Sequence, residues 1–367
     1  AKGDHVDTPM AMVQAIEDSH DLPTICWAAS GLTCLLHTSP SEIPAHAAAV
    51  IVQRFAQLPG AERRPLPGAA REAASALLGV LAELMLISEE ACALLRARLV
   101  AEAAAKDRAW TLMLMELVAV PAGEGAHEGG AAFVHACRTL ELLVRGDEEL
   151  AKALHQQRLL AAVGQRLLAG TTGGERDLRT GKAPEELPGT SWQPFANAAV
   201  VLIDALVSEQ DPDRFSIANP ELFRPVWMRY HRPEPVVDGC IAALERSLFR
   251  EGGAMVASQL HVAGLRALTQ LARLSKDQAE RILLSNGPSI GVEVMRLAGY
   301  HEEATSVSLV FLVQISGGAF AHKGLKAAGA DVAAKTAATR FPRSQAVQDT
   351  AAKVVAACSD LKVTGRA

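Results

Sequence analysis

The C-terminal third of the chain repeats a helical pattern with a period of about 42 residues. Three apolar segments there end on Ser275, Ser316 and Ser359, which are 41 and 43 residues apart. A second pair of positions, Gly287 and Gly329, is 42 residues apart, and each glycine follows its serine by 12 or 13 residues. One unit of this length cannot bury its own apolar face, so such units stack on one another. The period therefore predicts a solenoid of three-helix units.

The parts of each unit follow from residue type. The segment before each serine is apolar on almost all sides, as in residues 307–313, which is typical of a helix buried between neighbours. A polar turn and a short helix follow. We expect the short helix to end at Gly287 or Gly329, in the left-handed conformation that glycine adopts easily. A second, amphipathic helix is expected at residues 291–297 and 332–338.

Composition also favours helices. Hydrophobic residues make up 49% of the chain but aromatic residues only 4%, so the apolar side chains are mostly Ala, Leu and Val. Ala and Leu favour helices, whereas sheets are richer in β-branched and aromatic residues. With 21% charged residues, 28 Gly and 18 Pro, the composition excludes a disordered or low-complexity protein.

The last unit, residues 327–359 (AAGADVAAKTAATRFPRSQAVQDTAAKVVAACS), resembles an armadillo repeat. It has that family's small-Gly-small turn, a second helix, a turn with Pro and Ser, and a Val-Gln-acidic start to the long third helix. The resemblance is clearest over residues 258–359 and implies an all-α, right-handed α-solenoid of about six to eight degenerate armadillo-like three-helix repeats. Further segments that fit the unit lie at residues 25–39, 69–99, 138–170 and 197–211.

We expect one continuous solenoid over residues 9–361, with an N-terminal tail at 1–8 and a C-terminal tail at 362–367. Two Gly/Pro-rich stretches, at about residues 121–130 and 170–194, interrupt the period. They are too long for ordinary helix connections, so each is a protruding insertion or an arm that binds a partner. No change in composition accompanies them, which favours one solenoid over two domains.

The catalytic and metal-binding motifs that we searched for are incomplete. The sequences HEGGA (127–131) and HEEAT (301–305) begin like a zinc-protease helix but lack its second histidine. The TGK at 180–182 lacks the other residues of a phosphate-binding loop. His135 and Cys137 are two residues apart and would point about 200° apart on a helix, which favours packing over metal binding. We therefore expect no enzyme activity, no metal site and no cofactor.

The family resemblance implies a peptide-binding groove along the third helices. In peptide-binding armadillo proteins such as nuclear-import receptors and catenins, an Asn near the end of each third helix binds the backbone of an extended peptide. Alignment puts Gln270 and Gln314 at that position. The other units carry residues there that are poor backbone clamps, which argues against import-signal or catenin-type binding: Cys34, Leu84, Leu143, Ala205 and Ala357. The two glutamines are either groove donors or ordinary polar surface residues.

A second candidate surface is the segment at residues 223–235 (FRPVWMRYHRPEP), which places aromatic and basic residues between prolines. Trp, Tyr and Arg anchor many protein interfaces, and the same mixture suits single-stranded nucleic acid. The alternative is a repeat helix with its Trp in the core. Trp192, within the longer insertion, is a further anchor candidate. The candidate residues of the segment are Arg224, Trp227, Arg229, Tyr230 and Arg232.

Charge argues against nucleic acid as the partner. The net charge of the chain is −5, so no overall basic field attracts nucleic acid or an anionic membrane. Residues 322–367 differ from the rest, with eight Lys and Arg against three Asp and Glu. This basic end is either a docking surface for an acidic partner or a solvated face.

Membrane insertion and compartment can also be judged from the sequence. The longest uncharged runs, residues 22–41 and 304–322, contain Pro, His, Gln or Gly and are unlike a membrane span. The six cysteines are scattered through apolar stretches, so we expect buried, reduced thiols and an intracellular, reducing compartment, the cytoplasm or an organelle interior. The chain starts at Ala1, so either a presequence was removed or the numbering begins inside a precursor.

These observations favour a non-catalytic scaffold or assembly subunit that binds one or more proteins within a larger complex. The alternative is a regulatory binding module, such as a chaperone cofactor or nucleotide-exchange factor, because other armadillo-like proteins act by gripping a nucleotide-binding partner. A third hypothesis, a helical repeat that binds single-stranded RNA, conflicts with the net charge of −5.

Overall fold

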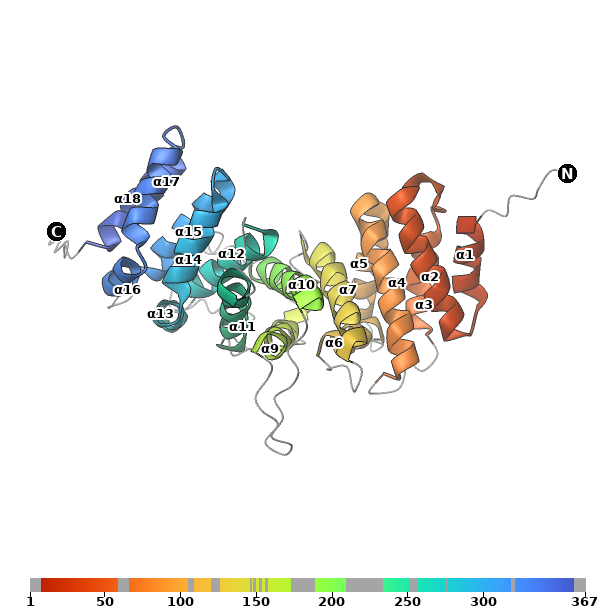
Figure 1. Ribbon diagram of the computed structural model, residues 1–367. Coiled ribbons are helices and arrows are strands. Elements are labelled where there is room, and N and C mark those ends of the chain that lie inside the picture. Colours follow the sequence, from red (N-terminus) through yellow and green to blue (C-terminus); the bar gives the residue numbers. More distant parts are fainter. Residues whose placement is uncertain are drawn as a thin grey trace, which may run out of the picture. The chain divides into compact units, whose positions relative to one another are not determined.

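The computed structural model consists of helices and their connections, with no strand among the residues that it describes (Figure 1). The chain divides into two compact units, residues 1–162 and 163–367, and each is described by itself. The residues described are 8–58, 66–104, 109–119, 126–145, 147, 150–151, 154–155, 158–172, 189–208, 234–250, 257–274, 276–317 and 321–359.

The first unit is a stack of three long helices with shorter helices along one side. The long helices α2, α4 and α7 pack in series, α2 against α4 and α4 against α7. The shorter helices α3, α5 and α6 connect them, and α1 packs against α2 and α3 at the start of the unit. The bounds are α1 Thr8–Asp18, α2 Leu22–Thr38, α3 Ala47–Ala56, α4 Gly68–Ile87, α5 Glu89–Ala104, α6 Ala109–Ala119 and α7 Ala126–Val144, with a 3₁₀ turn at Pro40–Glu42.

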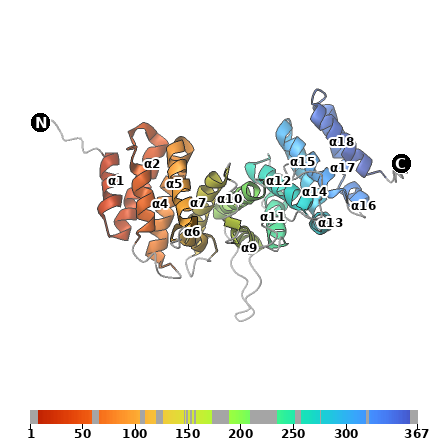
Figure 2. The same ribbon diagram turned by 180° about the vertical axis from the view of Figure 1, so that it is seen from behind.

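The second unit repeats this arrangement more regularly. The long helices α10, α12, α15 and α18 pack in series, and the second helices α14 and α17 lie side by side along them (Figures 1 and 2). The bounds are α10 Gly189–Ser208, α11 Glu234–Glu245, a π-helical turn Arg246–Arg250, α12 Gln259–Leu274, α13 Lys276–Leu284, α14 Gly287–Ala298, α15 Glu302–Ile315, α16 Ala321–Ala327, α17 Ala330–Arg340 and α18 Gln345–Ala357. Helix α9, Leu159–Thr172, contains the division between the units.

Two complete three-helix repeats are formed by α13 to α15 and by α16 to α18. This confirms the short first helix, amphipathic second helix and long third helix predicted for the C-terminal third. Seven third helices occur among the described residues, within the six to eight units expected: α2, α4, α7, α10, α12, α15 and α18. The fold class predicted from the period, an armadillo-like α-solenoid, is therefore confirmed.

Aliphatic packing of the third helices forms the core of each unit. In α15, Leu309, Phe311, Leu312 and Ile315 are buried, while Val307 is only half-buried. The helix therefore has neighbours on most sides, as its sequence predicted. Since burial of one such side chain contributes about 1.5–3 kcal/mol, the series of third helices is the main source of stability.

Side chains at the helix starts satisfy backbone donors that the helices leave free. The carboxylate of Asp21 accepts hydrogen bonds from the backbone N–H of Thr24 at 3.0 Å and from its hydroxyl at 2.6 Å, before α2. Ser344 caps α18 in the same way, through Val347 N at 3.4 Å. His301, the first residue of the HEEAT sequence, caps α15 by accepting from Ala304 N at 3.3 Å. This motif therefore has a structural use as a helix start.

Glycine occurs at positions 287 and 329 of the repeat for two different physical reasons. Gly329 has a φ of 75°, so it takes the left-handed conformation expected of it. Gly287 does not, which corrects the expectation for that position. It begins α14, and a Cβ there would lie 2.4 Å from the carbonyl oxygen of Ile282. Glycine is needed at 287 because α14 starts directly against the backbone of α13.

Helices occupy parts of both stretches that the sequence assigned to loops. Helix α7 begins at Ala126, α9 extends to Thr172 and α10 begins at Gly189. Within 121–130 and 170–194, the described residues are therefore helical. The rest of each stretch, residues 121–125 and 173–188, lies outside the described residues.

The cysteines are less uniformly buried than expected. Cys137, Cys240 and Cys358 are buried, and burial raises the pKa of the Cys240 thiol to about 12. Cys34, in contrast, is exposed on α2, which corrects the expectation of six buried thiols. No helix in the described part of the chain is long and apolar enough to cross a membrane.

A buried histidine joins α12 to the π-helical turn. The backbone N–H of Ser258 donates to Nδ1 of His261 at 2.9 Å, so the neutral ring carries its proton on Nε2 and donates to the hydroxyl of Ser247 at 3.0 Å. Only 1% of His261 is exposed. Burial lowers the pKa of this histidine to about 4, so the folded protein keeps it neutral.

Substitution of Gly287 by Ala should destabilise the protein, because the new Cβ would overlap the Ile282 carbonyl. We expect a loss of about 2 kcal/mol, read as a lower Tm in thermal unfolding. Gly324→Ala is the matched control, since its Cβ would meet only ordinary contacts, the nearest at 3.6 Å. This control should leave the protein unchanged or stabilise it by up to about 1 kcal/mol. Equal effects of the two substitutions would contradict the close-contact explanation.

Protonation of His261 should lower stability as the pH falls. Its folded pKa of about 4 lies below the ordinary 6.5, so the unfolded chain binds this proton more tightly than the folded chain. The free energy of unfolding should therefore decrease between about pH 6.5 and pH 4, by about 3 kcal/mol in total from this group. His261→Gln keeps an acceptor for Ser258 but does not titrate. If Tm falls equally for the variant and the parent over this range, His261 is not the responsible group.

Candidate functional site

The residues predicted as partner-binding anchors fall into three groups in the structure. Those at 223–235, Arg224, Trp227, Arg229, Tyr230 and Arg232, lie outside the described residues. Trp192 lies near the start of α10 and is fully buried, with the guanidinium carbon of Arg246 4.5 Å from its ring centre. This placement makes Trp192 a core residue of the second unit rather than the exposed anchor expected from the sequence.

Gln270 and Gln314 lie on two third helices that pack against each other, α12 and α15. Both are half-buried, and neither amide makes a side-chain hydrogen bond within the described part of the chain. The same two helices are joined by an ion pair between Arg266 of α12 and Glu303 of α15. The amides are therefore free to donate to a bound segment, and their role as groove donors remains a prediction.

Several large apolar side chains are exposed although the helices that carry them are well packed. Trp27 on α2 is 66% exposed, Leu284 at the end of α13 is 71% exposed, and Tyr300, between α14 and α15, is 87% exposed. Exposed aromatic side chains on a rigid framework are typical of the anchors that fill pockets of a partner. Trp27, Leu284 and Tyr300 are exposed in this way, whereas Trp192 is buried.

Sequence reasoning missed these anchors for a definable reason. Trp27 lies in a helix that is apolar on almost every side, so periodicity could not show which side faces outward. Tyr300 follows Gly299, whose φ is 55°, and a glycine before a helix start is a turn signal. That signal could have placed Tyr300 at the surface.

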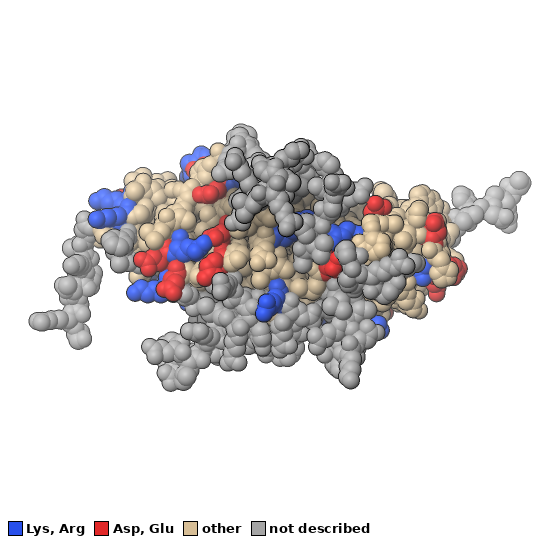
Figure 3. Space-filling view, turned by 90° about the horizontal axis from the view of Figure 1, so that it is seen from below, with Lys and Arg blue, Asp and Glu red and all other residues tan. Residues whose placement is uncertain are grey.

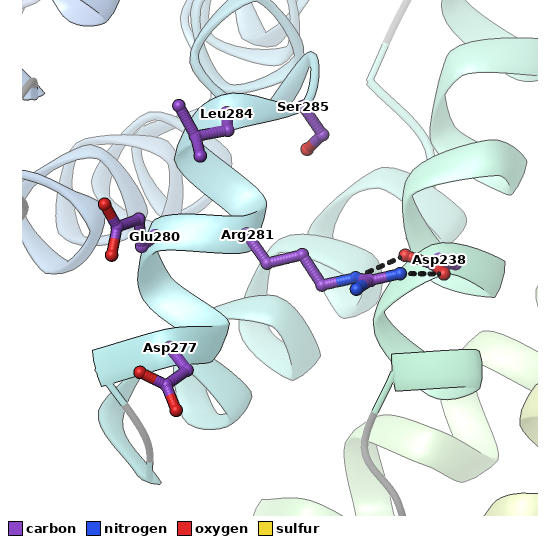
Figure 4. Close-up of a pocket in the computed structure, with 6 residues that line it drawn as sticks. All are labelled: Asp238, Asp277, Glu280, Arg281, Leu284 and Ser285. Carbon is purple, nitrogen blue, oxygen red and sulfur yellow. Dashed lines mark hydrogen bonds and ion pairs between the residues drawn. The ribbon is translucent and has the colours of Figure 1, made fainter.

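A surface hollow of about 540 Å³ lies between α11 and α13. Arg281 of α13 reaches across to α11, where it donates from Nε to Oδ1 of Asp238 at 2.8 Å and from Nη2 to Oδ2 at 2.5 Å (Figure 4). These hydrogen bonds raise the pKa of the Arg281 guanidinium, so it stays charged. The bidentate pair fastens one repeat to the next.

The carboxylates in this hollow are not arranged for acid–base chemistry. Asp277 and Glu280 point away from Arg281 in Figure 4, and the carboxylate of Asp238 is already occupied. Acidic side chains gather over this part of the second unit in the space-filling view (Figure 3). With the exposed Leu284 beside them, they form a surface with both charge and apolar area, open to solvent.

The other titratable groups considered as ligands are used in packing. His135 of α7 donates from Nδ1 to the carbonyl of Ser75 on α4 at 2.8 Å, and burial lowers the pKa of its ring. Cys137 is fully buried, which raises the pKa of its thiol well above the usual value. Among the described residues, no group of three His, Cys, Asp or Glu side chains is placed to hold a metal ion.

A second hollow, of about 420 Å³, lies at the turn between α17 and α18. The residues that line it are Glu302, Arg340, Phe341, Pro342, Arg343 and Ser344. Arg340 donates from Nη1 to the carbonyl of Gly299 in the preceding repeat at 2.5 Å, and its guanidinium lies 5.5 Å from the centre of the Tyr300 ring. Two successive turns therefore share one surface.

Comparisons with known proteins agree with this fold. No protein-family model matches the chain, and no curated protein matches its sequence. Among solved structures, the chain is similar to an engineered protein from the Northeast Structural Genomics Consortium, with a TM-score of 0.50 and 16% identity over 84% of this chain and 96% of that one.

Two designed armadillo repeat proteins are also similar. One has a TM-score of 0.49 and 15% identity over 84% of this chain and all (100%) of the designed chain. The other, in complex with the peptide (KR)4, has a TM-score of 0.48 and 14% identity over 84% of this chain and 99% of that one. The three-helix repeats, which stack through their third helices, make this chain an armadillo-like α-solenoid.

Proposed function

We propose that this protein is a non-catalytic scaffold subunit that binds other proteins within a larger assembly. The observation that carries the proposal is the exposure of Trp27 and Leu284 on packed helices and of Tyr300 at the turn between α14 and α15. Trp and Tyr are among the side chains that most often anchor protein interfaces. Because the repeats hold them rigidly, little conformational freedom is lost when a partner binds.

The charged surface of the second unit supports binding rather than catalysis. Its bidentate ion pair, Arg281 with Asp238, joins two helices and occupies both groups. Burial lowers the pKa of His135 and of His261, and each ring is hydrogen-bonded to a serine. These groups stabilise the repeats, and the exposed surface remains for partners.

Native purification of the tagged full chain from its source cells, followed by quantitative mass spectrometry, tests the proposal. We expect a fixed set of partner proteins in stoichiometric amounts. Trp27→Ala and Leu284→Ala, one in each unit, should each weaken binding of at least one partner by about tenfold and reduce its recovery, since truncation of an interface anchor that costs roughly 1.4 kcal/mol has that effect. Val332→Ala, at an exposed aliphatic position of α17, is the control and should leave recovery unchanged.

Three other outcomes would contradict the proposal. Substoichiometric partners that change when nucleotide is added would favour the regulatory module. Binding of RNA that weakens steeply with salt would favour the nucleic-acid hypothesis. Turnover of a substrate that a single substitution abolishes, with the protein still folded, would identify an enzyme.

A further inference from the structure

The turns between the second and third helices of the last two repeats form a continuous surface, which we call the turn edge. It consists of Tyr300, Glu302, Arg340, Phe341 and Arg343. Both turns lie at the upper end of their repeats in Figure 1, and the same is seen from behind in Figure 2. Tyr300 and Phe341 each directly follow the C-terminal part of a second helix, 41 residues apart. The repeat itself thus places two aromatic rings along this edge.

Backbone geometry fixes the turn edge in place. Gly299 has a φ of 55°, a conformation that L side chains rarely adopt, and its carbonyl accepts from Arg340 Nη1 at 2.5 Å. The guanidinium, held by this bond, lies over the Tyr300 ring. Tyr300 is therefore oriented by a neighbouring repeat while 87% of it stays exposed. An orientation set before binding reduces the entropy lost when a partner docks.

Charge indicates what kind of partner fits this surface. The last repeat, residues 321–359, has six Lys and Arg but only two Asp and Glu, in a chain whose net charge is −5. Arg343 lines the hollow, is exposed, and has no ion-pair partner among the described residues. A guanidinium of this kind binds a carboxylate through paired hydrogen bonds. Glu302, at the start of α15, would repel a carboxylate. The negative charges of a bound segment would therefore lie on the Arg343 side.

We propose that the turn edge binds an extended acidic segment of a partner protein, with carboxylates at Arg343 and an apolar or proline side chain against Tyr300. This inference rests on the proposed scaffold function and adds the chemistry of one partner. The hollow of about 420 Å³ accommodates side chains rather than a folded domain, and it is bordered by rings and guanidinium groups together.

Fluorescence anisotropy with the full chain tests the inference directly. The probe is a fluorescein-labelled peptide of roughly twelve residues in which Glu alternates with Pro, a sequence that stays extended in solution. We expect it to bind, and a peptide with Lys in place of Glu not to bind. Arg343→Ala and Tyr300→Ala should each weaken binding by about fivefold or more, whereas Glu302→Gln should tighten it by about two- to threefold.

Lys353→Ala is the matched control for charge. Lys353 is exposed on α18 of the same repeat and does not line the hollow, so its loss changes the net charge as much as the loss of Arg343 does. Equal weakening by Lys353→Ala and Arg343→Ala would overturn the proposal, because attraction would then be nonspecific. Absence of peptide binding would also overturn it, as would binding only to vesicles that contain an anionic lipid. These results would leave the scaffold function standing if cellular partners are still recovered stoichiometrically.

Discussion

A helix that is apolar on almost every side is stable in water only between other helices. This constraint applies to the third helices of the chain, and most of the architecture depends on it. Helix α15 is in contact with α12 on one side and α18 on the other, and its own second helix α14 covers a further face. Each repeat therefore completes the core of its neighbours. The shorter first and second helices, which tolerate polar residues, are left to form the outer surfaces.

That arrangement separates the residues that stabilise the protein from those available for binding. His135, which was considered as a metal ligand, is instead hydrogen-bonded to Ser75 on the adjoining helix α4, and Trp192 is buried in the core. The exposed anchors lie elsewhere, at a third-helix face, at the end of a first helix and at a turn. A repeat protein can change such positions without disturbing its core, because the contacts that hold the helices together lie on other faces.

The sequence predicted the helical units well because their signals are local and repeated. Serines and glycines at spacings near 42 residues located α12 to α18, and the uniformly apolar segments identified the third helices. It could not predict details that depend on how closely particular helices contact one another. The close approach of α14 to the Ile282 carbonyl, which requires Gly287, involves backbone positions that no periodicity records. The exposure of Trp27 likewise depends on which side of α2 is covered by α4. Glycine and proline also suggested loops at residues 126–130 and 189–194, but α7 and α10 begin there and Pro194 lies inside α10.

An arginine joins the repeats at each of two neighbouring junctions, but the groups that accept its hydrogen bonds differ chemically. Arg281 binds the carboxylate of Asp238, a side chain that a single substitution can remove and whose charge dissolved ions screen. Arg340 instead binds the backbone carbonyl of Gly299, an acceptor that every amino acid supplies. The first junction is therefore open to tuning by ionic strength and by mutation of its acceptor. At the second junction only the donor, Arg340, can be removed by substitution, because its acceptor is a backbone carbonyl.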